Sequence, residues 1–218
     1  MSLRVVIAAR GGPAAKSRLA ARLAESERAA LAEAMLTDML EALAGCGSVE
    51  RAYVVTPTPE FARLAADAGA VIVLEHEPRG LNAAFETARQ RLAAHNPEGL
   101  VALLPGDLPR LDAGEMTEAA KHAADGAIVI VRSQSDGGTG AIIQPVGLAL
   151  PLAFGSDSFR RHCGGAAGMG LAVASPRLAS LSQDLDRPED LDRLAGSGTK
   201  GRAAALARAF LPRRGVAA

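Results

Sequence analysis

The chain has 218 residues, a length that fits one α/β domain better than two small ones. Apolar residues make up 49% and aromatic residues only 3%, so a core of normal size has to be built from alanine, leucine and valine. The 24 basic and 24 acidic residues balance, which argues against nucleic acid or an anionic membrane as the main partner, because both usually require a basic excess. Small phosphorylated ligands need only a local cluster of donors.

The cysteines and histidines give no sign of metal or thiol chemistry. Cys46 and Cys163 have no CxxC spacing, and the four histidines are scattered. We therefore expect two packed, unreactive thiols in a reducing compartment. Residues 3–9 are too short an apolar run for a signal peptide, and no run reaches membrane-spanning length. These features predict a cytoplasmic protein with no membrane contact.

In the first part of the chain, short β-branched runs alternate with alanine- and leucine-rich segments of helical period. Strands are expected over residues 3–9, 52–56, 71–74, 100–104 and 127–131. Helices are expected over residues 26–44, 59–68, 81–94 and 113–124, the first with Ser26 as N-cap and Gly45 as its stop. The alternation predicts an α/β fold whose mixed, mostly parallel sheet carries helices on both faces.

The second part of the chain is less regular. A polar, glycine-rich loop is expected over residues 133–140 and a short strand over 141–144. The remaining expected elements are a helix over 156–167, short strands over 170–174 and 178–181, a helix from Asp190 and a last helix over 202–211. We expect one domain over residues 1–212 and a flexible tail over 213–218.

A glycine-rich segment with basic residues follows the first strand. In open α/β sheets ligands collect at the carboxyl ends of strands, and glycines let backbone N–H groups approach phosphate oxygens. Lys16 and Arg18 add positive charge here, although Ala15 stands where a Walker A loop needs glycine. Phosphate binding and an ordinary turn with solvated basic residues explain this segment equally well.

Three further segments carry polar residues just after strands or before helices. Asp107 follows the most apolar expected strand, where a carboxylate is placed to hold a divalent cation, or else serves as a turn residue. Asp184 and Asp186 lie two apart, so in an extended segment both face the same way, and Mg²⁺ prefers one or two carboxylates. The rival explanation for Asp186 is a capping box with Glu189. Asn82 begins a helix that can receive an anion, or is a simple N-cap.

Taken in order, these segments resemble the 2-phospho-L-lactate guanylyltransferase family, which acts in biosynthesis of a deazaflavin coenzyme of the F-420 type. The matching stretches cover nearly the whole chain. They are KSRL at 16–19, GLNAA at 80–84, GDLP at 106–109, GT at 138–139, FGSDSF at 154–159 with His162, DLD at 184–186 and PEDL at 188–191. The ordered set is specific, although no single stretch is.

The resemblance implies a single-domain nucleotide-diphospho-sugar transferase fold, which is glycosyltransferase-A-like and Rossmann-like. It implies that Lys16 and Asp107 are catalytic and that Mg²⁺ is held by Asp107, Asp184 and Asp186. It implies a GTP site made by Arg10, Gly11, Gly12, Lys16, Arg18, Gly80, Leu81, Asn82 and Gly106. It also implies that Thr139, Gly155 and Ser158 cradle the acid substrate, largely through backbone groups.

The reaction implied by the resemblance joins GMP from GTP to a small phosphorylated acid and releases pyrophosphate. An anionic phosphate oxygen attacks the α-phosphorus in line, so no general base is required. The acid can be 2-phospho-L-lactate, phosphoenolpyruvate or 3-phosphoglycerate, and the protein a monomer or a homodimer.

The sequence departs from the family pattern in two places. Gly140 stands where members usually have asparagine, after an atypical loop over 133–138, and residues 8–12 read AARGG where members usually have proline and lysine. Three alternatives therefore stay open. They are a related nucleotidyltransferase acting on a molybdopterin or sugar phosphate, a glycosyltransferase using the same aspartates, and a nucleotide-binding module without catalysis.

Overall fold

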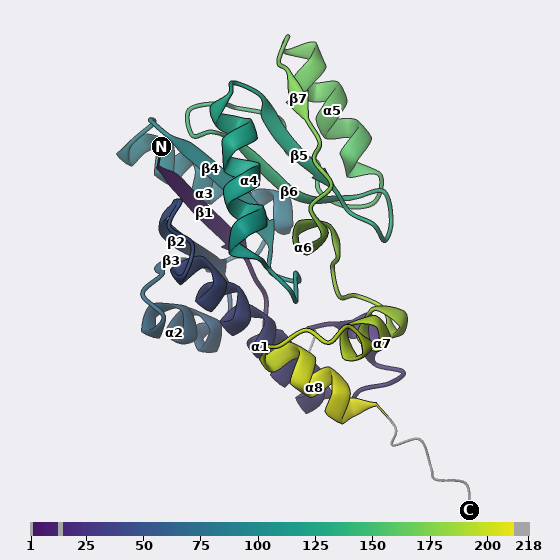
Figure 1. Ribbon diagram of the computed structural model, residues 1–218. Helices are drawn as coiled ribbons and strands as arrows, with labels where there is room; N and C mark the ends of the chain where they lie inside the picture. The colour runs from purple at the N-terminus through teal and green to yellow at the C-terminus, as the bar shows by residue number, and fades with distance from the viewer. Residues whose placement is uncertain (1, 13–14, 212–218) are drawn as a thin grey trace, which may run out of the picture.

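A seven-stranded sheet with strand order β3-β2-β1-β4-β6-β5-β7 forms the centre of the computed structural model, which describes residues 2–12 and 15–211 (Figure 1). The strands are β1 (Leu3–Ala8), β2 (Val49–Thr56), β3 (Val71–Leu74), β4 (Leu100–Pro105), β5 (Ile128–Arg132), β6 (Thr139–Pro145) and β7 (Val173–Ala174). Neighbouring strands are parallel except that β6 runs antiparallel to both β4 and β5. The prediction of a mixed, mostly parallel sheet is confirmed.

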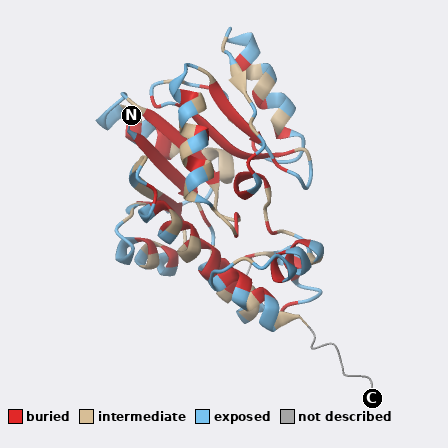
Figure 2. Cartoon of the chain, in the orientation of Figure 1, coloured by how far each residue is buried: buried red, intermediate tan, exposed pale blue. Residues whose placement is uncertain are grey.

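Helices cover both faces of this sheet, as predicted. They are α1 (Glu25–Ala44), α2 (Pro59–Asp67), α3 (Leu81–His95), α4 (Ala113–Ala124), α5 (Ser158–Gly168), α6 (Ala179–Ser182), α7 (Pro188–Gly196) and α8 (Arg202–Phe210), with a 3-10 turn over Ser17–Leu19. One core cluster joins α1 and α4 to one face of the sheet, and a second joins α3 and α5 to the opposite face, where α5 lies over β5 and β7. Figure 2 shows the strands as the most continuously buried part of the molecule.

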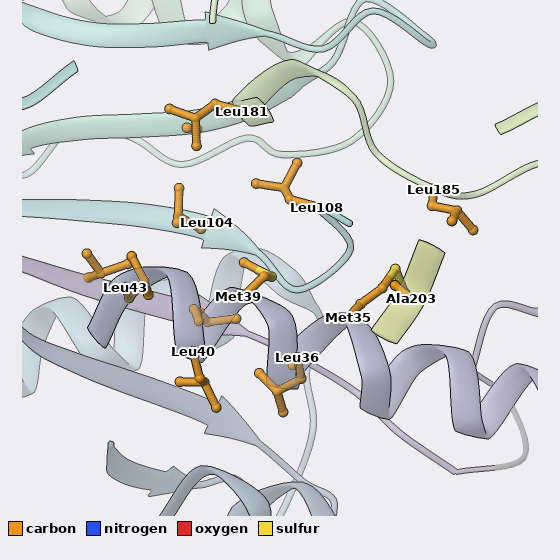
Figure 3. Close-up of a cluster of buried hydrophobic side chains, with 14 of the residues drawn as sticks. Met35, Leu36, Met39, Leu40, Leu43, Leu104, Leu108, Leu181, Leu185 and Ala203 are labelled. Atoms are coloured by element: carbon orange, nitrogen blue, oxygen red, sulfur yellow. The ribbon is translucent and has the colours of Figure 1, made fainter. Parts of the chain in front are cut away.

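The apolar stripe of α1 explains the larger core cluster. Met35, Leu36, Met39, Leu40 and Leu43 return at steps of three and four residues and are all buried. They meet Leu104, Leu108 and Leu181 from the sheet side and Ala203 from α8 (Figure 3). The core is thus aliphatic, as the composition requires.

Of the C-terminal helices, α8 packs against α1, and α7 packs against α8, away from the sheet (Figure 1). The carboxylate of Asp38 in α1 accepts hydrogen bonds from the backbone N–H groups of Arg202 and Ala203, at 3.0 and 2.9 Å. This contact satisfies free N–H groups at the start of α8 and complements its positive end.

Several local predictions are wrong. Residues 178–181 are not a strand, because Glu115 of α4 accepts hydrogen bonds from the N–H groups of Ala179 and Ser180 and stabilises the helical turn α6. The loop after β5 is shorter than expected, since β6 already begins at Thr139. Ser26 is not the N-cap of α1, which begins one residue earlier with Ala24 in that position.

Other predictions hold or concern residues outside the described ranges. Both thiols are free, with Cys46 buried and Cys163 partly buried. Over the described ranges, none of the helices has the combination of length and apolarity needed to cross a bilayer. Pro13 and Ala14 of the glycine-rich segment, and the tail predicted over 213–218, lie outside the described residues.

Candidate active site

Three aspartates from distant parts of the sequence meet at one end of the sheet. Asp107 follows β4, and Asp184 and Asp186 lie in the extended segment between α6 and α7. The N–H of Leu185 donates to the carbonyl of Asp107 at 3.0 Å, and the Leu185 side chain is buried in the core. Both flanking carboxylates therefore face away from the core, and one oxygen of each of the three lies within 4.8 Å of the others. The predicted convergence is confirmed.

The ammonium group of Lys16 lies against this cluster. Its Nζ is 2.9 Å from Asp186 Oδ1 and 3.4 Å from Asp107 Oδ2, with only 9% of the side chain exposed. The Lys16 backbone has φ of 50°, which is uncommon for a residue with a side chain and orients the lysine toward the aspartates. Arg18 adds a contact of 3.1 Å to Asp186 Oδ2.

Burial and charge pull the pKa values of these groups in different directions. Burial alone would lower the pKa of Lys16, but the nearby charges of Asp107 and Asp186 raise it above its usual value. Burial would likewise raise the pKa of Asp186, yet Lys16 and Arg18 hold it below its usual value. Desolvation outweighs Lys16 at Asp107 and raises its pKa. The cluster thus holds one carboxylate whose pKa is raised by burial and one whose pKa is lowered by neighbouring cations.

The interpretation of Asp186 as a helix cap is wrong. The helix α7 begins at Pro188, and the Asp190 carboxylate accepts hydrogen bonds from the N–H groups of Asp186 and Arg187, at 3.0 and 2.8 Å. Asp190 therefore caps the helix by reaching back along the chain. The side chain of Asp186 is left to the ion pairs with Lys16 and Arg18.

Hydroxyl groups hold the third carboxylate, Asp184. Ser135 Oγ donates to Asp184 at 2.8 Å, and Ser133 Oγ lies 3.2 Å from the same Oδ1 atom. Ser133 also accepts a hydrogen bond from the N–H of Ser135, so the loop that carries both serines is itself fixed. Neutral hydroxyl donors thus orient Asp184, whereas cationic side chains orient Asp186.

Two cavities meet at the carboxylate cluster. The larger has a volume of about 420 Å³ and the smaller of about 220 Å³. Residues common to both linings are Arg18, Leu81, Pro105, Asp107 and Asp186. The larger continues past Arg10 and Lys16 to apolar Val55 and Ala84, and the smaller is lined by the loop after β5 and the segment before α5.

The floor of the larger cavity requires glycine at position 106. A Cβ atom there would lie 2.7 Å from the Cβ of Ala9 and 3.0 Å from the carbonyl oxygen of Ala8. The N–H of Gly106 donates to that same carbonyl at 2.9 Å. Glycine thus lets the ends of β1 and β4 stay close and brings Asp107 beside the first loop.

The donor set suits a hard divalent cation. Three carboxylates offer oxygen atoms close together, and Mg²⁺ takes one or two carboxylates with substrate phosphates completing its coordination. A cavity lies on each side of the cluster, so a substrate on either side reaches it. This arrangement suits the transfer of a phosphoryl-type group between two ligands.

The sequence matches one family model over most of its length. The model described as "Guanylyl transferase CofC like" matches residues 3–210. The chain belongs to this family. The family resemblance found in the sequence motifs is thereby confirmed.

Curated CofC-like relatives carry related names. A protein of Phenylobacterium zucineum named 3-phospho-D-glycerate guanylyltransferase is 46% identical over 192 residues, covering 87% of this chain and 88% of its own. Phosphoenolpyruvate guanylyltransferases of Rubrobacter xylanophilus and Sphaerobacter thermophilus are 37% and 35% identical, covering 91% and 86% of this chain and 96% and 89% of their own.

Solved structures agree with the fold. A protein of Desulfovibrio desulfuricans classed as a candidate nucleotide-diphospho-sugar transferase superposes with a TM-score of 0.79 at 16% identity, covering 96% of this chain and 95% of its own. CMP:2-keto-3-deoxy-manno-octonic acid synthetase in complex with CTP gives 0.63 at 12% identity, with 96% and 100% covered. The CofC-like chain therefore has the nucleotidyltransferase fold that was expected.

The predicted nucleotide residues divide into two groups. Arg10, Lys16, Arg18, Leu81 and Gly106 line the larger cavity, while the other four lie outside its lining. Those four are Gly11, Gly12, Gly80 and Asn82. The role of all nine residues as nucleotide ligands stays a prediction.

Asn82 has a clear structural contact. Its Nδ2 donates to the carbonyl of Phe154 at 3.2 Å, and its Oδ1 accepts from the N–H of Phe154 at 2.7 Å. The N-cap of α3 is Gly80, so the interpretation of Asn82 as a cap is wrong. Asn82 instead joins the start of α3 to the segment before α5.

The predicted acid-binding residues also separate. Thr139 and Gly155 line the smaller cavity, whereas Ser158 is fully buried and does not. The hydroxyl of Ser158 donates to Thr139 Oγ1 at 3.1 Å, and its N–H donates to the carbonyl of Gly155 at 3.1 Å. A direct contact from Ser158 to the acid stays a prediction.

Sequence reasoning missed several polar residues of the site, among them Ser133, Ser135 and Asp136. Ser133 and Asp136 line the smaller cavity, and the two serines hold Asp184. The available signal was their position directly after a buried strand, the same rule that singled out Asp107. Because serine and aspartate are also common loop residues, composition alone did not separate the two possibilities.

Proposed function

We propose that this protein transfers GMP from GTP to a small phosphorylated acid and releases pyrophosphate, in the biosynthesis of a deazaflavin coenzyme of the F-420 type. The observation that carries the proposal is the cluster of Asp107, Asp184 and Asp186, which faces Lys16 and lies between two cavities. Membership in a guanylyl transferase family supports the nature of the group transferred.

The larger cavity is the proposed GTP site. Arg10, Lys16 and Arg18 supply positive charge along its lining, and Val55 and Ala84 supply apolar surface. A nucleoside triphosphate needs both kinds of surface, because the phosphates require donors and the base requires a dry contact. The smaller cavity, about half the volume, then takes the acid.

In the proposed reaction a phosphate oxygen of the acid attacks the α-phosphorus of GTP. The new P–O bond forms as the bond to the β-phosphate oxygen breaks, and pyrophosphate leaves with that electron pair. Because the attacking oxygen is already anionic, the chain's own residues position the two phosphates and neutralise charge rather than move a proton. Arg18 lines both cavities and can act on both substrates, whereas Lys16 lines the larger cavity and acts on GTP.

Mg²⁺ is the proposed cofactor, held by Asp107, Asp184 and Asp186. When bound it neutralises charge on the phosphate oxygens. The fit rests on the three carboxylate oxygens within 4.8 Å of one another and on the pKa of Asp107, which burial raises and a nearby cation would lower.

We propose 3-phosphoglycerate as the first acid to test. The relative named for that acid is 46% identical, whereas those named for phosphoenolpyruvate are 35% and 37% identical. Phosphoenolpyruvate and 2-phospho-L-lactate stay in the panel, because the three acids differ by only a few atoms.

The deciding experiment is mass spectrometry of the products formed from GTP, Mg²⁺ and each acid, with CTP in place of GTP as the control nucleotide. We expect a diester between GMP and one acid, formed with an equal amount of pyrophosphate. If none of the three acids gave such a product, the proposed function would be overturned. If a product formed with CTP but not with GTP, the choice of guanine as the base would be overturned.

A further inference from the structure

A buried chain of hydrogen bonds lies directly behind the smaller cavity. It joins Ser158 and His162 of α5 to Thr139, the first residue of β6. Ser158 and His162 have no exposed surface, whereas Thr139 lines the cavity. The ring of His162 also packs edge-on against Phe154, with centroids 5.0 Å apart. The imidazole is therefore held in one position.

The contacts of His162 determine which ring nitrogen carries the proton. Its Nε2 lies 2.8 Å from the backbone nitrogen of Ala153, which can only donate, so Nε2 is an acceptor. Burial, with a smaller effect of Arg161, lowers the pKa of His162 to about 4, so the ring is neutral at pH 7. The single ring proton then resides on Nδ1, which lies 2.9 Å from Thr139 Oγ1 and donates to it.

Thr139 Oγ1 therefore accepts two hydrogen bonds. One comes from His162 Nδ1–H and the other from the hydroxyl of Ser158 at 3.1 Å. A hydroxyl oxygen has two acceptor positions and one proton to donate. With both acceptor positions used, the proton of Thr139 is left for a partner in the cavity.

We propose that His162 and Ser158 fix the Thr139 hydroxyl as a hydrogen-bond donor directed into the smaller cavity, where it binds an anionic oxygen of the phosphorylated acid. His162 is a positioning residue in this arrangement, since it acts through Thr139. The inference rests on the proposed function for the identity of the ligand. It also gives a role to Ser158 and His162, whose side chains are buried behind the cavity: they hold the Thr139 hydroxyl in one orientation. A hydroxyl donor fixed in this way favours an acceptor such as a phosphate or carboxylate oxygen.

Two variants of His162 separate this role from simple packing. In His162→Asn the amide nitrogen takes the place of Nδ1 and keeps the donor to Thr139, but the acceptor for Ala153 N–H is lost. In His162→Gln the amide oxygen takes the place of Nε2 and keeps that acceptor, but the donor to Thr139 is lost. Each variant buries one amide group, so each is a control for the other.

Steady-state kinetics with the acid varied at saturating GTP is the first measurement. We expect His162→Gln to raise the KM for the acid roughly tenfold, as loss of one hydrogen bond to a charged oxygen predicts, with the KM for GTP unchanged. His162→Asn should recover most of that loss. Thr139→Val should raise the KM for the acid at least as much as His162→Gln, and Thr139→Ser should recover most of it. Equal effects of His162→Asn and His162→Gln, or a normal KM in Thr139→Val, would overturn the proposal.

Nitrogen-15 NMR of the histidine rings in the wild-type protein is the second measurement and needs no turnover. We expect the Nδ1–H tautomer for His162 at pH 7 and a shift of its Nδ1 resonance on addition of 3-phosphoglycerate. The Nε2–H tautomer, or a protonated ring, would overturn the proposal even if the variants fail to fold. If the wild type transfers GMP to none of the three acids, the proposed function fails, and this spectrum alone then decides on the hydrogen-bond arrangement.

Discussion

The two halves of the sheet contribute to the site in different ways. In the parallel half, β3-β2-β1-β4, each strand leads toward a helix; Gly106 and Asp107 follow the end of β4, and Lys16 lies in the longer loop after β1. In the other half, β6 runs antiparallel, and the site residues come from a tight loop after β5 and an extended segment before α7. Alternating strands and helices therefore supply one side of the site, and segments outside regular secondary structure supply the other.

Besides the ladder between β4 and β6, two specific contacts between the halves hold the charged cluster together. Lys16 from the parallel half pairs with Asp186 from the other half, 170 residues away along the chain. The N–H of Leu185 donates to the carbonyl of Asp107. Neither half holds the charged cluster alone, so substitutions in either half should affect function.

The largest effect is expected in the parallel half, for Asp107→Asn. The amide keeps the size of the side chain but removes the charge that would hold a cation, so we expect turnover to fall roughly 1,000-fold, about 4 kcal/mol of transition-state stabilisation. Pyrophosphate release measures the effect, and circular dichroism checks that the fold is intact. Asp192→Asn is the control, because Asp192 forms a surface ion pair with Arg22. Retained pyrophosphate release in Asp107→Asn would contradict the role of this carboxylate.

The second effect is a loss of stability in acid, centred on His162 in the irregular half. Its folded-state pKa, about 4, lies below its unfolded value, so the unfolded chain binds the proton more tightly. This contribution to stability is complete above the unfolded pKa of about 6.5 and is lost as pH falls toward 4, by about 3 kcal/mol in total.

Urea unfolding at pH 7 and at pH 4.5 measures this loss. Carboxylates titrate in the same range, so the quantity to compare is the difference in pH dependence between the wild type and His162→Gln. The variant should lose less stability on acidification. An identical pH dependence in the two proteins would rule out a neutral, buried His162 as the cause.

A third effect tests how closely the irregular segments pack. A Cβ atom at Gly140 would lie 1.9 Å from the carbonyl oxygen of Leu181, so Gly140→Ala must push α6 away from β6. Overpacking of this kind costs about 2 kcal/mol. Gly164→Ala in α5 is the matched control, because a methyl group at that position would meet nothing within 4 Å. Urea midpoints should fall for Gly140→Ala and stay or rise for the control; equal midpoints would show that the segment gives way without cost.

The smallest effect concerns the serines that hold Asp184. Replacing Ser133 and Ser135 by alanine removes the hydroxyls that orient this carboxylate, and such losses weaken metal binding about tenfold. Mn²⁺ binding, followed by electron paramagnetic resonance, measures the change without turnover. Ser182→Ala is the control, since its hydroxyl donates to the carbonyl of Ala179, away from the carboxylates. Unchanged Mn²⁺ affinity in the double variant would show that Asp184 needs no such support.

The parallel half was predictable from the sequence, because period and position carry physical information there. Strand and helix boundaries fall within a few residues of the expected ones, and the rule that ligands collect at strand ends picked out Asp107. The two-residue period likewise placed Asp184 and Asp186 on one side of an extended segment. Each of these inferences uses only neighbours in sequence.

The remaining features depend on contacts between distant residues. The local pattern predicted a strand over residues 178–181. The helical turn found there is stabilised by Glu115, which lies far away along the chain on α4. The capping role that was one of two explanations for Asp186 belongs to Asp190, and the Asp186 carboxylate pairs instead with Lys16, 170 residues away along the chain. Gly140, where the family pattern has asparagine, is explained only by the approach of the Leu181 carbonyl. No local pattern reveals such partners.

The two cavities have five lining residues in common, and the rest of their linings are separate. The shared residues are Arg18, Leu81, Pro105, Asp107 and Asp186. Substitutions in the loop after β5 or in the segment before α5 can therefore reshape the smaller cavity, the proposed acid site, while the lining of the larger cavity is unchanged. Under the proposed function, evolution or protein engineering could therefore change which acid is accepted while the residues of the proposed GTP site stay the same.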